Sequence, residues 1–431
     1  MYKLLLKLIV YRNIEKDSIL FRIADICRAV EENDFDADRM TELTMSEIYR
    51  LLELAAEYGF EGNLWHQYLA YLFAMTENPF TLAAEKADES EGSVKSFALN
   101  DLEIFRQIFD YDFSYMEQRL GLTCFTDMQN YTAMRSAGTN CDHNAGMRIK
   151  ELCRTLEDAK APEEFYAAVL LFYQKYGVGD LGMNKAFRVS RHNPTHCLIP
   201  ISMVSDAEFD DIIGYDAQKS ELMRNTEAFL AGKPANNVLL YGDAGTGKST
   251  SIKALLNRYY DRGLRMIEVY KHQFQDLNSV IAQIKNRNYK FIIYMDDLSF
   301  EEFEIEYKYL KAVIEGGLEK KPDNVLIYAT SNRRHLIRET FKDKEERNND
   351  LHTNDTVQEK LSLVARFGVT IYFGAPDKKQ FQNIVKTLAE KYQVQMPEEE
   401  LLAEANKWEL SHGGLSGRTA QQFINYLLGK Q

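Results

Sequence analysis

Residues 237–250 read Asn237-Val-Leu-Leu-Tyr-Gly-Asp-Ala-Gly-Thr-Gly-Lys-Ser-Thr250 and decide the fold of the second half of the chain. Gly242 is followed by four residues and then by Gly-Lys-Ser at 247–249, which satisfies the pattern G-x-x-x-x-G-K-[ST] of a phosphate-binding loop in full. The apolar run before the loop suits a buried parallel strand, and residues 251–260 suit a helix. The stretch therefore predicts strand, phosphate loop and helix in succession, with a chance glycine turn as the alternative.

The chemistry of polyphosphate binding explains these residue types. Glycines let the main chain turn tightly enough to point backbone N–H groups at phosphate oxygens, and the helix N-terminus adds a partial positive charge beneath them. Lys248 can reach the outer phosphates, and the Ser249 hydroxyl can coordinate Mg²⁺, which prefers oxygen ligands. The residues predicted to hold the phosphates are Gly242, Asp243, Ala244, Gly245, Thr246, Gly247, Lys248, Ser249 and Thr250.

The composition is that of an ordinary globular protein. The chain has 431 residues, 45% of them hydrophobic and 27% charged, which leaves room for two or three domains. Its net charge of −13 argues against binding nucleic acid through overall charge, although a local basic patch stays open. The N-terminus lacks the length of a membrane span and the cleavage site of a signal peptide. Five scattered cysteines are typical of reduced thiols, so we expect a cytoplasmic protein without a membrane partner.

Hydrophobic periodicity predicts three domains. Residues 1–205 show helical spacing almost throughout, which indicates an all-helical N-terminal domain. Residues 206–376 alternate apolar strands with helices, which predicts an α/β core with a five-stranded parallel sheet covered on both faces. Residues 377–431 are helical again and suit a C-terminal lid. The predicted strands are residues 238–241, 264–270, 290–297, 324–332 and 368–374.

Two neighbouring aspartates complete the predicted metal site. Asp296 ends an apolar strand and is therefore expected at the carboxyl edge of the sheet, where ligands bind in open α/β folds. We assign it, with Ser249, to Mg²⁺. Asp297 follows and is placed to orient or deprotonate an attacking water. A solvated acidic turn is the alternative reading of this pair.

The sequence resembles the AAA+ ATPases, and its second half resembles one bacterial family of predicted ATP-binding proteins, that of the domain of unknown function numbered 815. The fold that this resemblance implies is an AAA+ P-loop NTPase core with a helical lid, preceded by a helical region. The stretches that carry it are Ile213-Gly-Tyr-Asp-Ala-Gln-Lys219, residues 225–249, Asp296-Asp-Leu-Ser-Phe-Glu301, Ala329-Thr-Ser-Asn-Arg-Arg-His-Leu336 and Ser416-Gly-Arg418.

The resemblance also implies roles for three further residues. Asn332 matches sensor 1, whose amide holds the attacking water, and Arg418 matches sensor 2, the lid arginine that reaches the phosphates. Arg366 matches an arginine finger, which acts in trans in a neighbouring subunit and so requires a homo-oligomer. Arg333 and Arg334 are rivals for the finger. A strand-end cap and surface arginines are the structural alternatives.

ATP is the nucleotide that the resemblance implies. Ile213, with Ile212 and Tyr215, resembles the segment that lines an adenine pocket, although apolar residues there suit a core equally well. The guanine-reading pattern Asn-Lys-x-Asp is absent from the chain.

One position departs from the usual AAA+ pattern. Many such enzymes place glutamate after the metal-binding aspartate, whereas this chain has Asp297, whose side chain is one methylene shorter. Slow hydrolysis with help from Glu301 or Glu302 is compatible with that departure.

Two functional hypotheses follow. In the first, the protein hydrolyses ATP with Mg²⁺ and uses the energy on an unidentified protein or nucleic-acid partner. In the second, it is a nucleotide-gated binding or scaffold module with little or no turnover. Phosphotransfer to a small molecule is a weaker third, because no acceptor site is visible.

Overall fold

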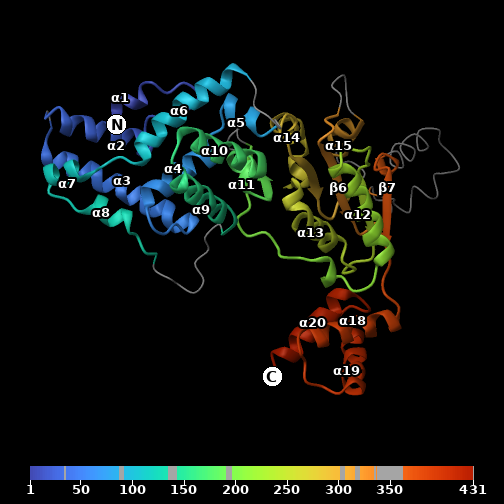
Figure 1. Cartoon of the computed structure of the whole chain (residues 1–431). Coiled ribbons are helices and arrows are strands. Elements are labelled where there is room, and N and C mark those ends of the chain that lie inside the picture. Colours follow the sequence, from blue (N-terminus) through green and yellow to red (C-terminus); the bar gives the residue numbers. More distant parts are fainter. Residues whose placement is uncertain are drawn as a thin grey trace. The chain divides into compact units, whose positions relative to one another are not determined.

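The computed structural model describes residues 1–431 except residues 34, 87–91, 134–142, 191–196, 301–305, 316–320, 334–335, 337–362 and 431. The chain divides into two compact units, Met1–Asn184 and Lys185–Gln431, which are described separately (Figure 1). The division lies before the predicted boundary at residue 205, because residues 186–189 and 198–200 pair within the sheet of the second unit.

The first unit is built from helices in the part that the structure describes. Its core is rich in fully buried aromatic side chains, among them Tyr11, Trp65, Phe73 and Phe105. Rings of this size bury large apolar areas and pack edge to face, as Tyr11 does against Phe73. The helices are α1 (Tyr2–Leu5), α2 (Ile19–Glu31), α3 (Ala37–Tyr58), α4 (Leu64–Met75), α5 (Pro79–Ala84), α6 (Ser93–Phe109), α7 (Ser114–Leu120), α8 (Cys124–Gln129), α9 (His143–Asp158), α10 (Pro162–Tyr176) and α11 (Gly179–Met183).

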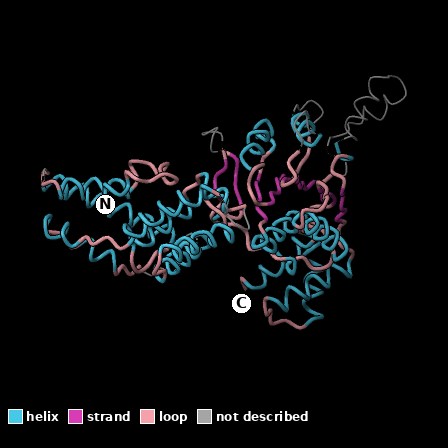
Figure 2. Tube along the Cα trace, turned by 45° about the horizontal axis from the view of Figure 1, so that its top comes forward, coloured by secondary structure: helices cyan, strands magenta, loops and turns pink. Residues whose placement is uncertain are grey.

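In its described residues, the second unit contains a seven-stranded sheet in the order β2-β1-β4-β5-β6-β3-β7. All neighbours run parallel except β1 and β2. Figure 2 shows helices on both sides of these strands. The strands are β1 (Ala186–Val189), β2 (Leu198–Pro200), β3 (Val238–Gly242), β4 (Leu264–Glu268), β5 (Lys290–Met295), β6 (Val325–Ser331) and β7 (Val369–Phe373), and the helices of this part are η1 (Phe209–Asp211), α12 (Asp216–Leu230), α13 (Lys248–Tyr259), η2 (Tyr260–Arg262), η3 (Lys271–Asp276), α14 (Leu277–Ile284) and α15 (Glu306–Glu315).

The prediction of five strands was wrong. The five predicted strands are present as β3 to β7, and β1 and β2 extend the sheet beyond β4. These two strands have four and three residues and lie in a stretch rich in glycine and proline. Segments that short carry too few residues to reveal an alternating pattern, and β1 becomes a strand by pairing with β4.

Three helices follow the sheet and form a small bundle, α18 (Lys378–Lys391), α19 (Glu398–Ser411) and α20 (Gly417–Leu428). They share their own hydrophobic core, which includes Phe381, Ala405 and Phe423. Ser416 caps α20 by accepting a hydrogen bond from the Thr419 N–H at 3.1 Å. The described helices contain no segment long and apolar enough to cross a membrane.

The half-buried Lys321 gives a stability prediction. Its ammonium donates to Asn237 Oδ1 at 2.8 Å, and burial lowers its pKa to about 8. Below about pH 8, Lys321 is charged in both the folded and the unfolded state, so the folded state bears the full cost of burying the charge. Above roughly pH 10.4, Lys321 is neutral in both states, and this cost disappears. Lys321→Met should therefore raise the free energy of unfolding at neutral pH by about 1–3 kcal/mol.

Urea unfolding at neutral pH and above the ordinary lysine pKa checks this prediction. Asn237 Oδ1 keeps a second donor, the Ile327 N–H at 2.9 Å, so the substitution leaves no orphaned acceptor. Lys233→Met, at an exposed position, is the control and should leave stability unchanged. A gain from Lys321→Met that is the same at both pH values contradicts the electrostatic explanation.

Candidate functional site

Two glycines shape the loop between β3 and α13. Gly242 has φ 134°, and a Cβ there would lie 2.1 Å from the Phe373 carbonyl oxygen of β7. Gly247 has φ 92° and begins α13, with Ile212 packed on it at 3.1 Å from the position of a Cβ. Only glycine adopts these conformations without strain, so the loop passes close to β7 and then turns directly into the helix.

Gly242→Ala should destabilise the protein by at least about 2–4 kcal/mol, because the backbone strain and the collision with a β7 carbonyl add together. Gly263→Ala is a matched control, since Gly263 also has a positive φ of 86° but open space around it. Chemical denaturation of both proteins measures the difference. Equal losses in the two variants would show that the close approach to β7 carries no cost.

Lys248 is buried at the first turn of α13. Its ammonium donates to the Gly242 carbonyl at 3.0 Å and to the Asp243 carbonyl at 2.6 Å. Burial lowers the pKa of Lys248, nearby aspartates oppose that shift, and the charge of Arg418 adds to it. The loop therefore concentrates positive charge where its backbone turns.

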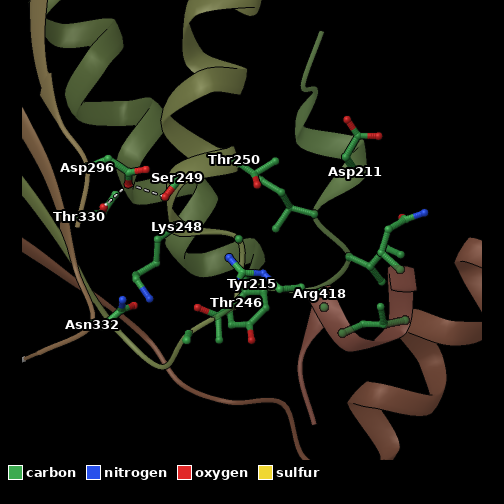
Figure 3. Close-up of a pocket in the computed structure, with 18 of the residues that line it drawn as sticks. Asp211, Tyr215, Thr246, Lys248, Ser249, Thr250, Asp296, Thr330, Asn332 and Arg418 are labelled. Carbon is green, nitrogen blue, oxygen red and sulfur yellow. Dashed lines mark hydrogen bonds between the residues drawn. The ribbon is translucent and has the colours of Figure 1, made fainter. Parts of the chain in front are cut away.

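Asp296 lies at the carboxyl end of β5 and joins three elements of the site. Its Oδ1 accepts hydrogen bonds from the Ser249 hydroxyl of α13 and the Thr330 hydroxyl of β6, both at 2.6 Å (Figure 3). Burial raises its pKa, but these hydrogen bonds outweigh burial, so the pKa lies below the ordinary carboxyl value. Asp296 is consequently an anion at neutral pH.

Asp297 sits in a constrained conformation beside it. Its φ is 49°, a left-handed conformation that aspartate tolerates better than most residues. Its backbone N–H donates to Thr330 Oγ1 at 2.9 Å, and its Oδ1 accepts from the Asn332 amide at 2.8 Å. Thr330 thus holds both aspartates, and Asn332 orients the second.

The oxygens gathered here suit a hard divalent cation. The Ser249 hydroxyl and the Asp296 carboxylate are the ligand types that Mg²⁺ takes when waters and phosphates supply the rest. The buried Tyr294 hydroxyl lies near Ser249 and Asp296, and burial together with the Asp296 charge raises its pKa. No cluster of three or more His, Cys, Asp or Glu side chains is found among the described residues.

A cavity of about 560 Å³ joins these groups to the helical bundle. The Arg418 N–H donates to the Gly245 carbonyl at 3.2 Å, and a Cβ on Gly245 would lie 3.1 Å from the Arg418 Cβ, so α20 begins directly on the loop. Figure 3 shows the Arg418 side chain extending toward the loop. The lining residues are Asp211, Ile212, Ile213, Tyr215, Ala244, Gly245, Thr246, Gly247, Lys248, Ser249, Thr250, Asp296, Asp297, Thr330, Asn332, Ile384, Leu388, Gly417, Arg418 and Gln421.

The cavity is lined by both polar and apolar side chains. Lys248, Ser249 and the aspartates supply polar groups. The apolar side chains include Ile212, Ile213 and, from α18, Ile384 and Leu388. A nucleotide likewise combines a charged polyphosphate with a flat base.

Most of the predicted site residues line this cavity, whereas Gly242, Asp243 and Arg366 do not. Arg366 forms an ion pair with Glu315 of α15, and its Nη1 is buried without a hydrogen-bond partner in the described part. Its rival Arg333 is exposed and does not line the cavity. Arg334, and the predicted helpers Glu301 and Glu302, lie outside the described residues.

Sequence reasoning missed several lining residues. Thr330 was recognisable, because it stands two residues before Asn332 and the two-residue period of a strand places both on one face. Asp211, Ile384, Leu388 and Gln421 gave no signal of this kind, since they reach the cavity only through packing of η1 and the helical bundle.

Comparison with known proteins identifies a family. A family model described as "Protein of unknown function (DUF815)" matches residues 182–431, which is more than half of the chain. No curated protein matches.

Proposed function

The chain belongs to the family described as protein of unknown function (DUF815), and from that premise we propose that it is a Mg²⁺-dependent ATPase of the AAA+ type. The observation that carries the proposal is the Asp296–Ser249 contact at 2.6 Å, which joins the end of β5 to the turn after the glycine-rich loop. A phosphate-binding loop needs an acidic partner at that point to complete a cation site.

The other contacts give each residue a part in hydrolysis. Backbone N–H groups of the loop and Lys248 would bind the phosphates, in place of the carbonyls that the lysine now contacts. Mg²⁺, when bound, would neutralise phosphate charge, with Ser249 and Asp296 as its protein ligands. Asp297 would orient a water and accept its proton as the oxygen attacks the terminal phosphorus, whose bond to the bridging oxygen breaks.

Two further groups would complete that reaction. Asn332, already hydrogen-bonded to the Asp297 carboxylate, would hold that carboxylate in position. Arg418, which belongs to the helical bundle, would contact the phosphates. Arg366 points to no group of this cavity, so its proposed role is in trans, in a second copy of the chain.

Phosphate release by the purified full chain tests the proposal. We expect release with ATP and Mg²⁺, loss of release when EDTA removes the cation, and recovery when Mg²⁺ is returned. GTP should bind more weakly than ATP, because the guanine-reading pattern Asn-Lys-x-Asp is absent from the chain. Failure to bind either nucleotide would overturn the proposal.

A nucleotide-gated scaffold is the second candidate, and one observation favours it. Asp297 Oδ1 is occupied by the Asn332 amide, and the residue is fixed in a left-handed conformation. A carboxylate held in this way activates water slowly unless the hydrogen bond rearranges. ATP would then stabilise one arrangement of the bundle on the core, and turnover would be incidental.

Thr330→Val tests the positioning of the two aspartates. Valine keeps the shape and removes the hydroxyl that donates to Asp296 and accepts from Asp297. The Mg²⁺ concentration for half-maximal phosphate release should rise by roughly 10–100-fold, since a hydrogen bond to a charged group contributes about 1.5–3 kcal/mol. Thr330→Ser should retain the original value. An unchanged Mg²⁺ requirement in Thr330→Val would remove Thr330 from the site.

A further inference from the structure

The net charge of the chain lies entirely in its first unit. Residues 1–184 contain 31 Asp and Glu against 18 Lys and Arg, whereas residues 185–431 contain 34 of each, so the first unit carries the whole net charge of −13. A unit this acidic repels nucleic acid and attracts basic surfaces. Two apolar surfaces with opposite borders lie on it.

The first surface follows α3 and is called the α3 stripe. Met45, Tyr49 and Leu52 are 40%, 61% and 38% exposed, and their spacing of four and three residues places them on one face of this 22-residue helix. Glu42 precedes the stripe by one turn, and Glu53 borders it at the other end. Neither carboxylate has a cationic partner in the described part of the unit. The stripe is therefore an apolar face with an unneutralised acidic border.

The second surface, the α1–α6 patch, is formed by the segment after α1 and the start of α6. Leu6, Ile9, Val94 and Phe97 are 57%, 49%, 41% and 46% exposed. The two segments touch, because the Ile9 N–H donates to Asp101 Oδ1 of α6 at 2.9 Å. Val94 and Phe97 lie on the turns of α6 before that contact.

In the part of the chain that the structure describes, three lysines border the α1–α6 patch. Lys3, Lys7 and Lys95 are exposed, and none of them has a carboxylate partner among the described residues. Asn100 fixes the backbone of Lys7 through a hydrogen bond from Nδ2 to its carbonyl oxygen at 3.4 Å. The α1–α6 patch is therefore apolar like the α3 stripe, but lysines border the patch whereas glutamates border the stripe.

The two surfaces cannot meet within one chain. Helix α2 packs against both α1 and α3 and lies between them. Figure 1 shows α1 and α6 along one edge of the unit and α3 farther toward the other edge. Complementary surfaces on separate faces join successive copies head to tail, which produces a ring when the rotation closes and a filament when it does not.

We propose that the α3 stripe of one chain docks on the α1–α6 patch of a second copy, so that the first unit assembles the protein head to tail. Apolar side chains exposed together on one face are typical of interaction sites. The opposite borders align the two surfaces and disfavour the like-charged pairings of stripe with stripe or patch with patch.

Sedimentation or light scattering of the full chain without nucleotide tests this assembly. Its mass should rise above that of one chain with concentration and fall at high salt, because the borders are charged. Tyr49→Ser and Phe97→Ser should each reduce the protein to single chains. Both side chains are substantially exposed, so folding should be unaffected, and thermal denaturation checks this. Leu171→Ser, at a 61% exposed position on α10, is the matched control and should assemble normally.

Mixing the two deficient variants gives the decisive result. The Tyr49→Ser protein keeps an intact α1–α6 patch, and the Phe97→Ser protein keeps an intact α3 stripe. An equimolar mixture should therefore form dimers that contain one chain of each variant, and no larger species. Glu42→Lys/Glu53→Lys mixed with Lys3→Glu/Lys7→Glu should restore growth, because both contacts are again complementary in charge.

Three results would overturn the proposal: a single chain for the unmodified protein at all concentrations, assembly that persists in Tyr49→Ser, or a mixture of the deficient variants that stays monomeric. Because no nucleotide is present, each outcome is independent of whether the chain hydrolyses ATP.

Discussion

The Asp297→Asn protein should bind ATP as tightly as the unmodified chain and release phosphate at least about a hundred times more slowly. Asparagine tolerates the left-handed backbone of this position and keeps the shape of the side chain, so the substitution removes the proton acceptor and little else. Phosphate release at saturating ATP measures the rate, and calorimetry measures the binding. Asp297→Ala should lose the same activity with some added loss of stability from the strained backbone.

Asp210→Asn is the control for this prediction. Asp210 is an exposed carboxylate next to η1 residue Asp211 but does not line the cavity, so its loss should leave both rate and binding unchanged. An Asp297→Asn protein that still turns over at the unmodified rate would show that another group accepts the proton. Glu301 and Glu302 would then be the residues to replace.

The second large effect concerns Lys248. Lys248→Ala should weaken ATP binding at least about a hundredfold, because two charge-assisted hydrogen bonds to phosphate, each contributing about 1.5–3 kcal/mol, are lost. Phosphate release should disappear with binding. Titration of the protein with ATP by calorimetry gives the affinity directly.

Folding must be separated from binding for this variant, since Lys248 is buried and donates to two loop carbonyls. Lys248→Met keeps the aliphatic length and should fold as the unmodified chain does, yet bind ATP as poorly as Lys248→Ala. Lys233→Ala, at an exposed turn, should have no effect on either property. Tight ATP binding by a folded Lys248→Met protein would remove the loop from the nucleotide site.

The local sequence pattern was sufficient to predict those parts of the site that come directly after a strand in the chain. The sequence around Gly242 predicted the strand, the turn and α13, and Asp296 was expected at the carboxyl edge of the sheet, where it lies. Both predictions depend on chain direction alone, because parallel strands bring their carboxyl ends to one edge.

Tertiary packing decided what the sequence did not reveal. The segment β1 has only four residues and forms a strand because it pairs with β4. The contact between Arg418 and Gly245 depends on how the bundle folds back over the loop, which the hydrophobic period of α20 does not specify. Thr330 was within reach of pattern reasoning, but its double role appears only when β5 and β6 are seen side by side.

Single-turnover hydrolysis tests the central claim most directly. The unmodified chain, in excess over labelled ATP so that all nucleotide is bound, is mixed with Mg²⁺ and quenched at intervals. We predict that bound ATP becomes ADP and phosphate in equal amounts with Mg²⁺, and stays intact with EDTA or in the Asp297→Asn protein. ATP that remains intact on the unmodified chain in the presence of Mg²⁺ would contradict the proposed hydrolysis and leave a nucleotide-gated scaffold.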